Sequence, residues 1–405
     1  MAVWWWIPLR SLWRNRRRTL LSIGIVALGT AVSFFVLGFV ESSRRLIQES
    51  TVAEYGNLQI ASPTLWSGAS DSYERLIPPD AAARVAATLA DEPALTGSTD
   101  QLQFSGLLAR GERTQVVRAT GVVPGNGVLD FDDLVVNGRG LAPDDTAAIL
   151  VGRSLAEKLG LSPGDSITLT LTTVDGAYNA SPFAVAGVYR FTSESFEQQV
   201  VFVPLGYAQR VLHTEGVDRV IVSLSRLDAT DPARERLQST LRAAGLPYDV
   251  KTWDELSPYY RQLSSYFDAL FGFLTLAVFV LVFFIILQVL TLAFLERTRE
   301  IGTIRALGTT RAQVFRLFFA ESAWLAVIGS AAGIAVGLLL GAIFNAAGIE
   351  WRPPGTVEPV RLVVQQGLAT AAIPFVVSVA ATLLSALFPS LEAARLRVVD
   401  ALRVD

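Results

Sequence analysis

Four long runs of mostly apolar residues constrain how this chain of 405 residues can fold. A helix needs about 20 such residues to cross the hydrocarbon core of a bilayer. We therefore predict four transmembrane helices, and the last three runs are long enough to tilt or to project from the membrane. The predicted spans are residues 19–40, 269–295, 317–349 and 362–390.

Arginine residues collect before the first span, between the second and third, and after the fourth. Basic residues near span ends favour the cytoplasmic side. We therefore expect both termini to be cytoplasmic, in a plasma (inner) membrane, and residues 41–265 to lie outside. The remaining predicted segments are an interfacial helix at 1–18, rich in Trp and Arg, a cytoplasmic loop at 296–316, an external loop at 350–361 and a cytoplasmic tail at 391–405.

The stretch between the first two spans is long enough to fold around its own core. Strand and helix signals alternate along it, and turns at Arg110-Gly111-Glu112 and Asp175-Gly176 predict two β-hairpins. We predict a membrane α-helical protein with a large extracytoplasmic α/β domain, residues 57–253, inserted between helices 1 and 2. A second lobe is expected at about 126–198.

Two polar segments, 41–56 and 254–268, join this domain to the spans. Their helical spacing predicts a stalk, and flexible linkers are the alternative that their scarcity of Gly and Pro disfavours. Residues 41–265 hold 28 acids against 19 Lys and Arg, and the whole chain has a net charge of −3. This charge argues against nucleic-acid binding.

Several kinds of catalytic site are excluded by composition. The chain has no Cys and one His, His213, at the predicted end of a short surface helix. Its two Lys, Lys158 and Lys251, do not lie in a phosphate-binding G-x-x-x-x-G-K-[ST] loop. We expect no catalytic site, metal or cofactor in this chain and no ATP hydrolysis by it alone. If transport is driven by ATP, then ATP and Mg belong to another polypeptide.

The loop at 296–316 has the sequence of a short helix between two spans. Gly308 is suited to a left-handed helix end, and Thr310 with Gln313 forms a T-x-x-Q capping box that starts the next helix. Ile301, Ile304 and Leu307 recur on one side. Such a helix can insert into a groove of a cytoplasmic partner. The alternative is a basic loop that only sets topology.

Several segments resemble the FtsX/MacB/LolCE permeases, the membrane subunits of mechanotransmission-type ABC transporters. They are EIGTIRALG with RAQVFRLFFAES (300–308 and 311–322), RSLWRNRRRTLLSIGIVALG (10–29), ILVGRSLAEKLGLSPGDSITL (149–169) and PSLEAARLRVVDALR (389–403). In the last segment Val399 stands where the family commonly has Pro.

The resemblance implies a dimer of this permease, or of it with a paralogue, bound to two copies of a separate ABC ATPase. It also implies Porter-like and Sabre-like lobes in the external domain. The ATPase-coupling residues would be Arg297, Glu300, Ile301, Gly302, Ile304, Arg305, Ala306, Leu307 and Gly308.

The resemblance leaves the substrate open. The segment TVAEYGNLQI is more similar to the lipoprotein-releasing branch, so we expect release or export of a lipoprotein or another lipophile, with a periplasmic carrier. The alternatives are efflux of a drug or peptide with an adaptor protein, and a membrane-anchored sensor or signalling subunit that transports nothing.

The predicted topology can be tested by cysteine labelling, because the chain has no native Cys. A Cys at Ser70 should react with an impermeant thiol reagent in cells whose outer envelope is permeable. A Cys at Thr309 should not react until the inner membrane is opened. The reverse pattern would contradict the predicted orientation.

Overall fold

The computed structural model describes residues 16–66, 75–125, 128, 134–191, 193–352 and 359–395. The predicted interfacial helix at 1–18, the tail beyond Arg395 and the loop residue Ser70 fall wholly or largely outside this range. The chain divides into two compact units. We call the described parts of 1–46, 263–351 and 361–405 the helical unit, and those of 47–262 and 352–360 the α/β domain.

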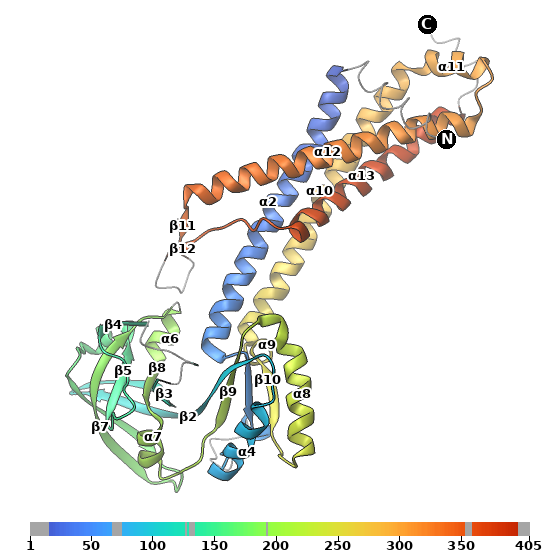
Figure 1. Cartoon of the computed structure of the whole chain (residues 1–405). Coiled ribbons are helices and arrows are strands. Elements are labelled where there is room, and N and C mark those ends of the chain that lie inside the picture. The colour runs from blue at the N-terminus through green and yellow to red at the C-terminus, as the bar shows by residue number, and fades with distance from the viewer. Residues whose placement is uncertain are drawn as a thin grey trace. The chain divides into compact units, whose positions relative to one another are not determined.

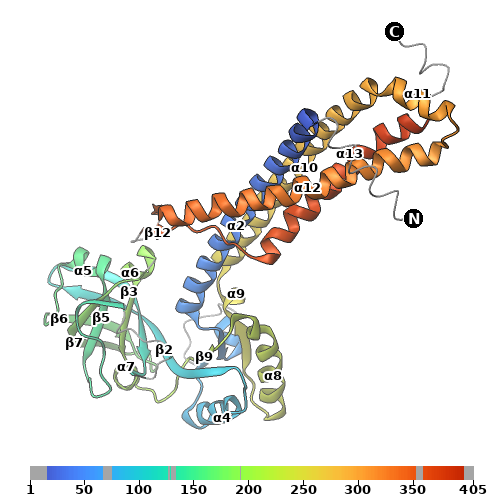
Figure 2. The same cartoon turned by 45° about the horizontal axis from the view of Figure 1, so that its top comes forward.

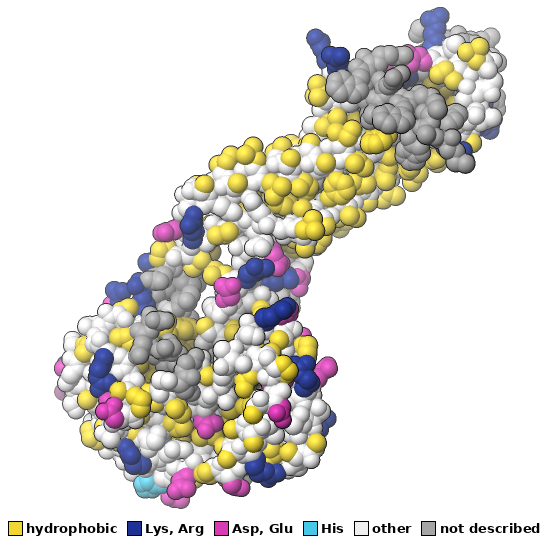
Figure 3. Space-filling view, viewed as in Figure 1, with side chains coloured by type: hydrophobic (Ala, Val, Ile, Leu, Met, Phe, Trp, Pro, Cys, Tyr) yellow, Lys and Arg dark blue, Asp and Glu magenta, His cyan; other side chains and the backbone are white. Residues whose placement is uncertain are grey.

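The helical unit contains four helices that are long and apolar enough to cross a membrane. Figures 1 and 2 show α12 and α13 side by side, and Figure 3 shows hydrophobic side chains over the surface of this unit. The long helices and the short helix α11 have the following bounds: α2 Arg16–Tyr55, α10 Pro258–Glu296, α11 Thr298–Ala306, α12 Arg311–Ala347 and α13 Leu368–Arg395.

Small residues allow α12 to approach α2 closely. A Cβ atom added to Gly333 would lie 2.5 Å from Cβ of Thr30 and 2.6 Å from the carbonyl oxygen of Ala27. Such close helix packing relies on small residues because lipid offers no hydrophobic drive for helix association. Any larger residue at Gly333 would force these helices apart.

The fourth helix begins at Leu368, later than the predicted start at residue 362. The preceding segment is extended, and its backbone groups are bound by neighbouring helices instead. The side chain of Asn345 accepts from Val364 N at 2.8 Å and donates to Val364 O at 3.0 Å, while Gln365 N donates to Gly38 O at 2.9 Å. Because these partners satisfy the backbone, an apolar segment can remain non-helical.

The α/β domain has ten strands among its described residues, in the order β10-β1-β9-β2-β3-β8-β5-β7-β4, with β6 pairing with β2 and β7. The strands are β1 Leu58–Ala61, β2 Leu95–Arg110, β3 Arg113–Val122, β4 Val135–Gly138, β5 Ala148–Gly152, β6 Ser166–Thr172, β7 Tyr178–Tyr189, β8 Val200–Pro204, β9 Arg219–Leu224 and β10 Asp249–Thr252.

Short helices connect and cover these strands. They are α3 Pro63–Trp66, α4 Pro79–Leu89, α5 Arg153–Leu159, α6 Glu194–Gln199, α7 Leu205–Leu212, the 3-10 turn η3 Leu227–Ala229, α8 Thr230–Ala243 and α9 Trp253–Leu256. Outside the domain's main sheet, β11 Glu350–Trp351 and β12 Val360–Arg361 form a two-stranded sheet.

The two predicted hairpins are confirmed, because β2 pairs antiparallel with β3 and β6 pairs antiparallel with β7. The bounds of the second lobe, about 126–198, stay a prediction. We call the strands from the second half of β2 to β8 the second lobe, and in it β3 pairs antiparallel with β2 and in parallel with β8. Turn residues show where a chain reverses, but they do not show which distant strand will be its neighbour.

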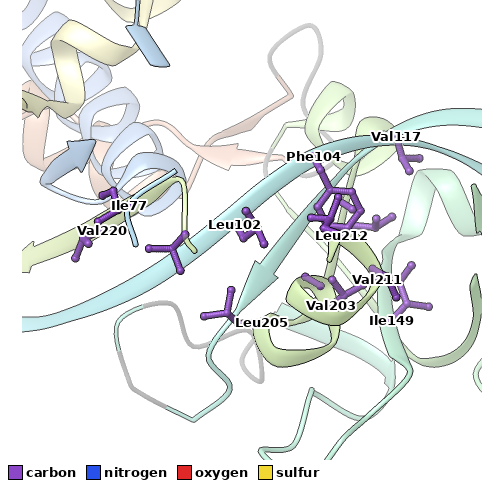
Figure 4. Close-up of a cluster of buried hydrophobic side chains, with 14 of the residues drawn as sticks. Ile77, Leu102, Phe104, Val117, Ile149, Val203, Leu205, Val211, Leu212 and Val220 are labelled. Atoms are coloured by element: carbon purple, nitrogen blue, oxygen red, sulfur yellow. The ribbon is translucent and has the colours of Figure 1, made fainter. Parts of the chain in front are cut away.

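Strand β2 is shared by the two lobes. Its first half, from Leu95 to Gln101, pairs with β9, and its second half, from Leu102 to Arg110, pairs with β3. Helices α4 and α7 pack against β2, and α8 packs against β10 and α4. One hydrophobic core runs beneath both halves of β2, and Figure 4 shows part of it around Leu102, Phe104 and Leu212.

Glu197 of α6 is fully buried and holds three segments of the second lobe together. One carboxylate oxygen accepts from Phe191 N at 2.7 Å. The other accepts from the hydroxyl of Ser154 at 2.8 Å and from its backbone N at 3.2 Å. The carboxylate therefore satisfies three donors on two half-buried residues.

We predict that Glu197→Ala will destabilise the α/β domain by about 3 kcal/mol, since it leaves three donors without their acceptor. The melting temperature of the full chain in detergent should fall. Glu194→Ala is the matched control because Glu194 is an exposed acid on the same helix, and it should leave the melting temperature nearly unchanged. Equal effects of the two substitutions would contradict this assignment.

Candidate coupling site

The polar segment between α10 and α12 folds as predicted, into a short helix with defined ends. Helix α10 ends at Glu296, and α11 follows directly. Gly308 has a φ of 102°, in the left-handed region that favours glycine. The predicted capping box is confirmed, because Thr310 and Gln313 bind each other's backbone N–H groups. These signals fix α11 as a separate element.

The inner face of α11 is anchored in a small hydrophobic core. Ile301 is only 2% exposed and packs with Phe294 of α10, Val314 of α12 and Ala393 of α13. Thr298 and Gly302 are also buried. Because residues from three long helices surround Ile301, a force on α11 would be passed to all of them.

Arg297, directly before α11, is turned inward. Its guanidinium donates to both carboxylate oxygens of Glu321 at 3.2 Å. The two side chains are 12% and 14% exposed, so this ion pair is largely shielded from water. Arg297, one of the predicted coupling residues, thus has an ion-pair partner within the chain.

The outer face of α11 exposes apolar side chains. Leu307 is 84% exposed and Ile304 is 40% exposed. Glu300, Ala306 and Gly308 are exposed as well, whereas Arg305 is half-buried. The predicted coupling residues therefore separate into an inner set, Arg297, Ile301 and Gly302, and an outer set around Leu307.

Sequence reasoning missed the residues that support α11 from below. Glu321, Phe294, Val314 and Ala393 were not among the predicted coupling residues, although Val314 lies in the predicted loop at 296–316 and Ala393 in the predicted tail at 391–405. A signal was present, because Glu321 is the one carboxylate within the predicted third span and faces a loop rich in Arg. A charged group at such a position needs a partner.

Models of two protein families match the chain. The model of the MacB-like periplasmic core domain matches residues 19–240, and the model of the FtsX-like permease C-terminal region matches residues 272–398. The chain belongs to the FtsX/MacB/LolCE-like permease family. The family and the fold class predicted from the sequence, four membrane helices with an inserted α/β domain, are confirmed.

Relatives of the permease come from two branches. Lipoprotein-releasing system transmembrane protein LolC of Xylella fastidiosa (strain 9a5c) is 24% identical over 78% of this chain and 79% of its own length. LolC of Neisseria meningitidis serogroup B is 25% identical over 83% and 81%. Macrolide export ATP-binding/permease protein MacB of Burkholderia cenocepacia is 23% identical over 99% and 57%. The permease is thus an ABC transporter permease of the LolC/MacB/FtsX type.

A solved structure is similar to part of the permease. The periplasmic region of MacB from Actinobacillus actinomycetemcomitans is 15% identical and has a TM-score of 0.38, covering 51% of this chain and 93% of that one.

The inward position of Arg297 makes a specific prediction. Arg297→Gln should lower the melting temperature of the chain in detergent, since breaking a shielded ion pair costs about 3 kcal/mol. The charge swap of Arg297→Glu with Glu321→Arg should recover most of the loss. Arg299→Gln, which removes an exposed charge next to it, should have little effect.

The alternative is that Arg297 contacts a partner protein. If Arg297 acts on a partner protein, Arg297→Gln will leave the melting temperature unchanged, and the charge swap will not restore function.

Proposed function

We propose that this chain is the permease subunit of an ABC transporter that couples ATP hydrolysis on a separate ATPase to conformational change in its α/β domain. The observation that carries this proposal is the division of α11 into two faces. Ile301 anchors the helix among α10, α12 and α13, while Leu307 and Ile304 remain exposed to a partner. A partner that binds the outer face would move the helices that hold the inner face.

The proposed partner is an ABC ATPase, present in two copies, which would supply ATP and Mg. The proposed location is a bacterial plasma (inner) membrane with both termini and α11 in the cytoplasm and the α/β domain outside. Helix α10 exposes apolar side chains such as Leu276, Leu281 and Phe284. Lipid and a second permease subunit would together cover them, which supports a dimer.

Release of a lipoprotein or another lipophile is the substrate assignment that we favour. The two LolC relatives align over 79% and 81% of their length, so the similarity includes both units of the fold. Efflux of a drug or peptide is the second candidate, because the MacB relative aligns with 99% of this chain. Mass spectrometry of material that co-purifies with the complex would distinguish an acylated protein and its carrier from an adaptor.

The coupling proposal can be tested at Leu307. An apolar anchor lost from the centre of an interface costs about 2 kcal/mol or more, roughly a 30-fold loss of affinity. Leu307→Asp should do more, because it also buries an unpaired carboxylate. We predict that the variant inserts and folds but no longer co-purifies with its ATPase.

Gly308→Val should have a similar effect by misdirecting the chain after α11, because a β-branched residue resists the positive φ. Ala312→Asp is the matched control, as it adds the same charge at an exposed position in the first turn of α12, where acids are tolerated. Normal ATPase binding and transport by Leu307→Asp would remove the support for coupling. A loop that only sets topology predicts that both substitutions are silent and that removal of several Arg residues is not.

A further inference from the structure

The α/β domain contains a cavity of about 900 Å³ that the proposed function leaves unused. Its floor is one face of the sheet. The end of α2, from Val52 to Tyr55, and the segment from Glu255 to Arg261 also line it. A cavity of this volume is within the range of sites that bind small organic ligands.

The floor of the cavity is polar because the strands alternate. On β2, Leu102 and Phe104 point into the hydrophobic core, and Gln101 and Gln103 line the cavity. The same alternation on β1, β3 and β9 brings three further polar side chains to this face: Gln59, Thr120 and Arg219. This face of the sheet therefore offers hydrogen-bond donors and acceptors to the cavity, and the opposite face packs in the hydrophobic core.

Arg219 is held rigidly in this floor. Its side chain is 13% exposed and pairs with the buried Asp218 at 2.9 Å. It also donates to the side-chain oxygens of Gln59 at 3.2 Å and Gln103 at 3.1 Å. Three strands thereby fix one guanidinium at the cavity, and its donors are largely bound within the protein.

Cations outnumber acids around the cavity. Arg75, Arg118, Lys251 and Arg261 join Arg219 in the lining, against the carboxylates of Glu54 and Glu255. Glu255 is already bound, because it accepts from Thr252 N at 3.2 Å and pairs with Arg234 at 3.2 Å. The charge of Glu255 is therefore compensated from outside the cavity, and that of Arg219 is compensated by Asp218. The other four cations of the lining stand against Glu54, so an excess of positive charge favours an anion.

The second-lobe side of the cavity is apolar. Phe191, Phe196 and Phe202 line it and contact one another, with ring centroids 4.5 Å apart for Phe191 and Phe196 and 6.2 Å apart for Phe196 and Phe202. The cationic and apolar linings meet on neighbouring strands. In the parallel pairing of β3 with β8, Arg118 is the register partner of Val200, and Thr120 is that of Phe202.

We propose that this cavity binds an anionic amphiphile, with its phosphate or carboxylate group at Arg118 and its alkyl chain along the half-buried Phe191 and Phe196. The physiological role of such a ligand, as cargo or as an effector, rests on the proposed transport function. The binding itself is a property of the α/β domain and needs no ATPase.

The binding test uses the full chain in phosphatidylcholine nanodiscs and titration calorimetry, with protein-free nanodiscs as the reference for partitioning. The first probe, octyl phosphate, carries both an anionic group and an alkyl chain. Inorganic phosphate carries the anion alone, and octyl glucoside carries the alkyl chain without a charge. Octyl phosphate should bind saturably at one site per chain. It should bind at least about tenfold more tightly than either of the other probes, because burial of the alkyl chain adds to pairing of the charge.

Three substitutions test the assigned residues. Arg118→Gln should weaken octyl phosphate binding about tenfold, the effect of losing one charged hydrogen bond. Arg113→Gln is the matched control on the same strand, because Arg113 is exposed and does not line the cavity. Glu54→Gln should strengthen binding by removing a carboxylate from the lining, and a gain of affinity cannot arise from misfolding.

Three results would overturn the proposal. They are the absence of saturable binding above the nanodisc reference, equal affinity for octyl phosphate and octyl glucoside, and equal effects of Arg118→Gln and Arg113→Gln. Failure here is separable from failure of the coupling proposal, since Leu307→Asp should bind octyl phosphate normally and Arg118→Gln should bind the ATPase normally.

Discussion

The α/β domain depends on the shared strand β2. Its ladder of backbone hydrogen bonds continues from β9 to β3, so the two lobes cannot separate without breaking backbone pairing. The alternation of side chains also continues along it. Leu102, Phe104 and Leu108 therefore lie in one core, while Gln101 and Gln103 line one cavity. Both the stability of the domain and its candidate ligand site follow from the same strand.

In the helical unit, a few polar contacts hold the apolar helices and their connecting segments in place. Asn345 binds the backbone of Val364, Gly38 accepts from Gln365, and Arg297 pairs with Glu321. Each contact satisfies groups that an apolar surrounding would leave without partners, so each is costly to break. Together they determine where α13 starts and how α11 is seated, which hydrophobic packing alone would leave loosely specified.

Two continuous helices link the units. Helix α2 runs from Arg16 to Tyr55, and α10 runs from Pro258 to Glu296. Their ends in the α/β domain provide Tyr55 and Arg261 to the lining of the cavity, and α10 ends immediately before α11. Helix α10 therefore contributes Arg261 to the lining of the cavity and Phe294 to the core beneath α11.

The sequence by itself determined the features that depend on local chemistry. Hydropathy identified four spans, turn residues identified two hairpins, and Gly308 with Thr310 and Gln313 bounded α11, because each signal lies within a few residues of the structure that it specifies. The tertiary structure alone decided the parallel pairing of β3 with β8, the late start of α13, the inward turn of Arg297 and the polar floor beneath the cavity. These depend on which distant residues become neighbours, and a linear pattern does not state that, because long-range contacts are chosen by the packing of the whole fold.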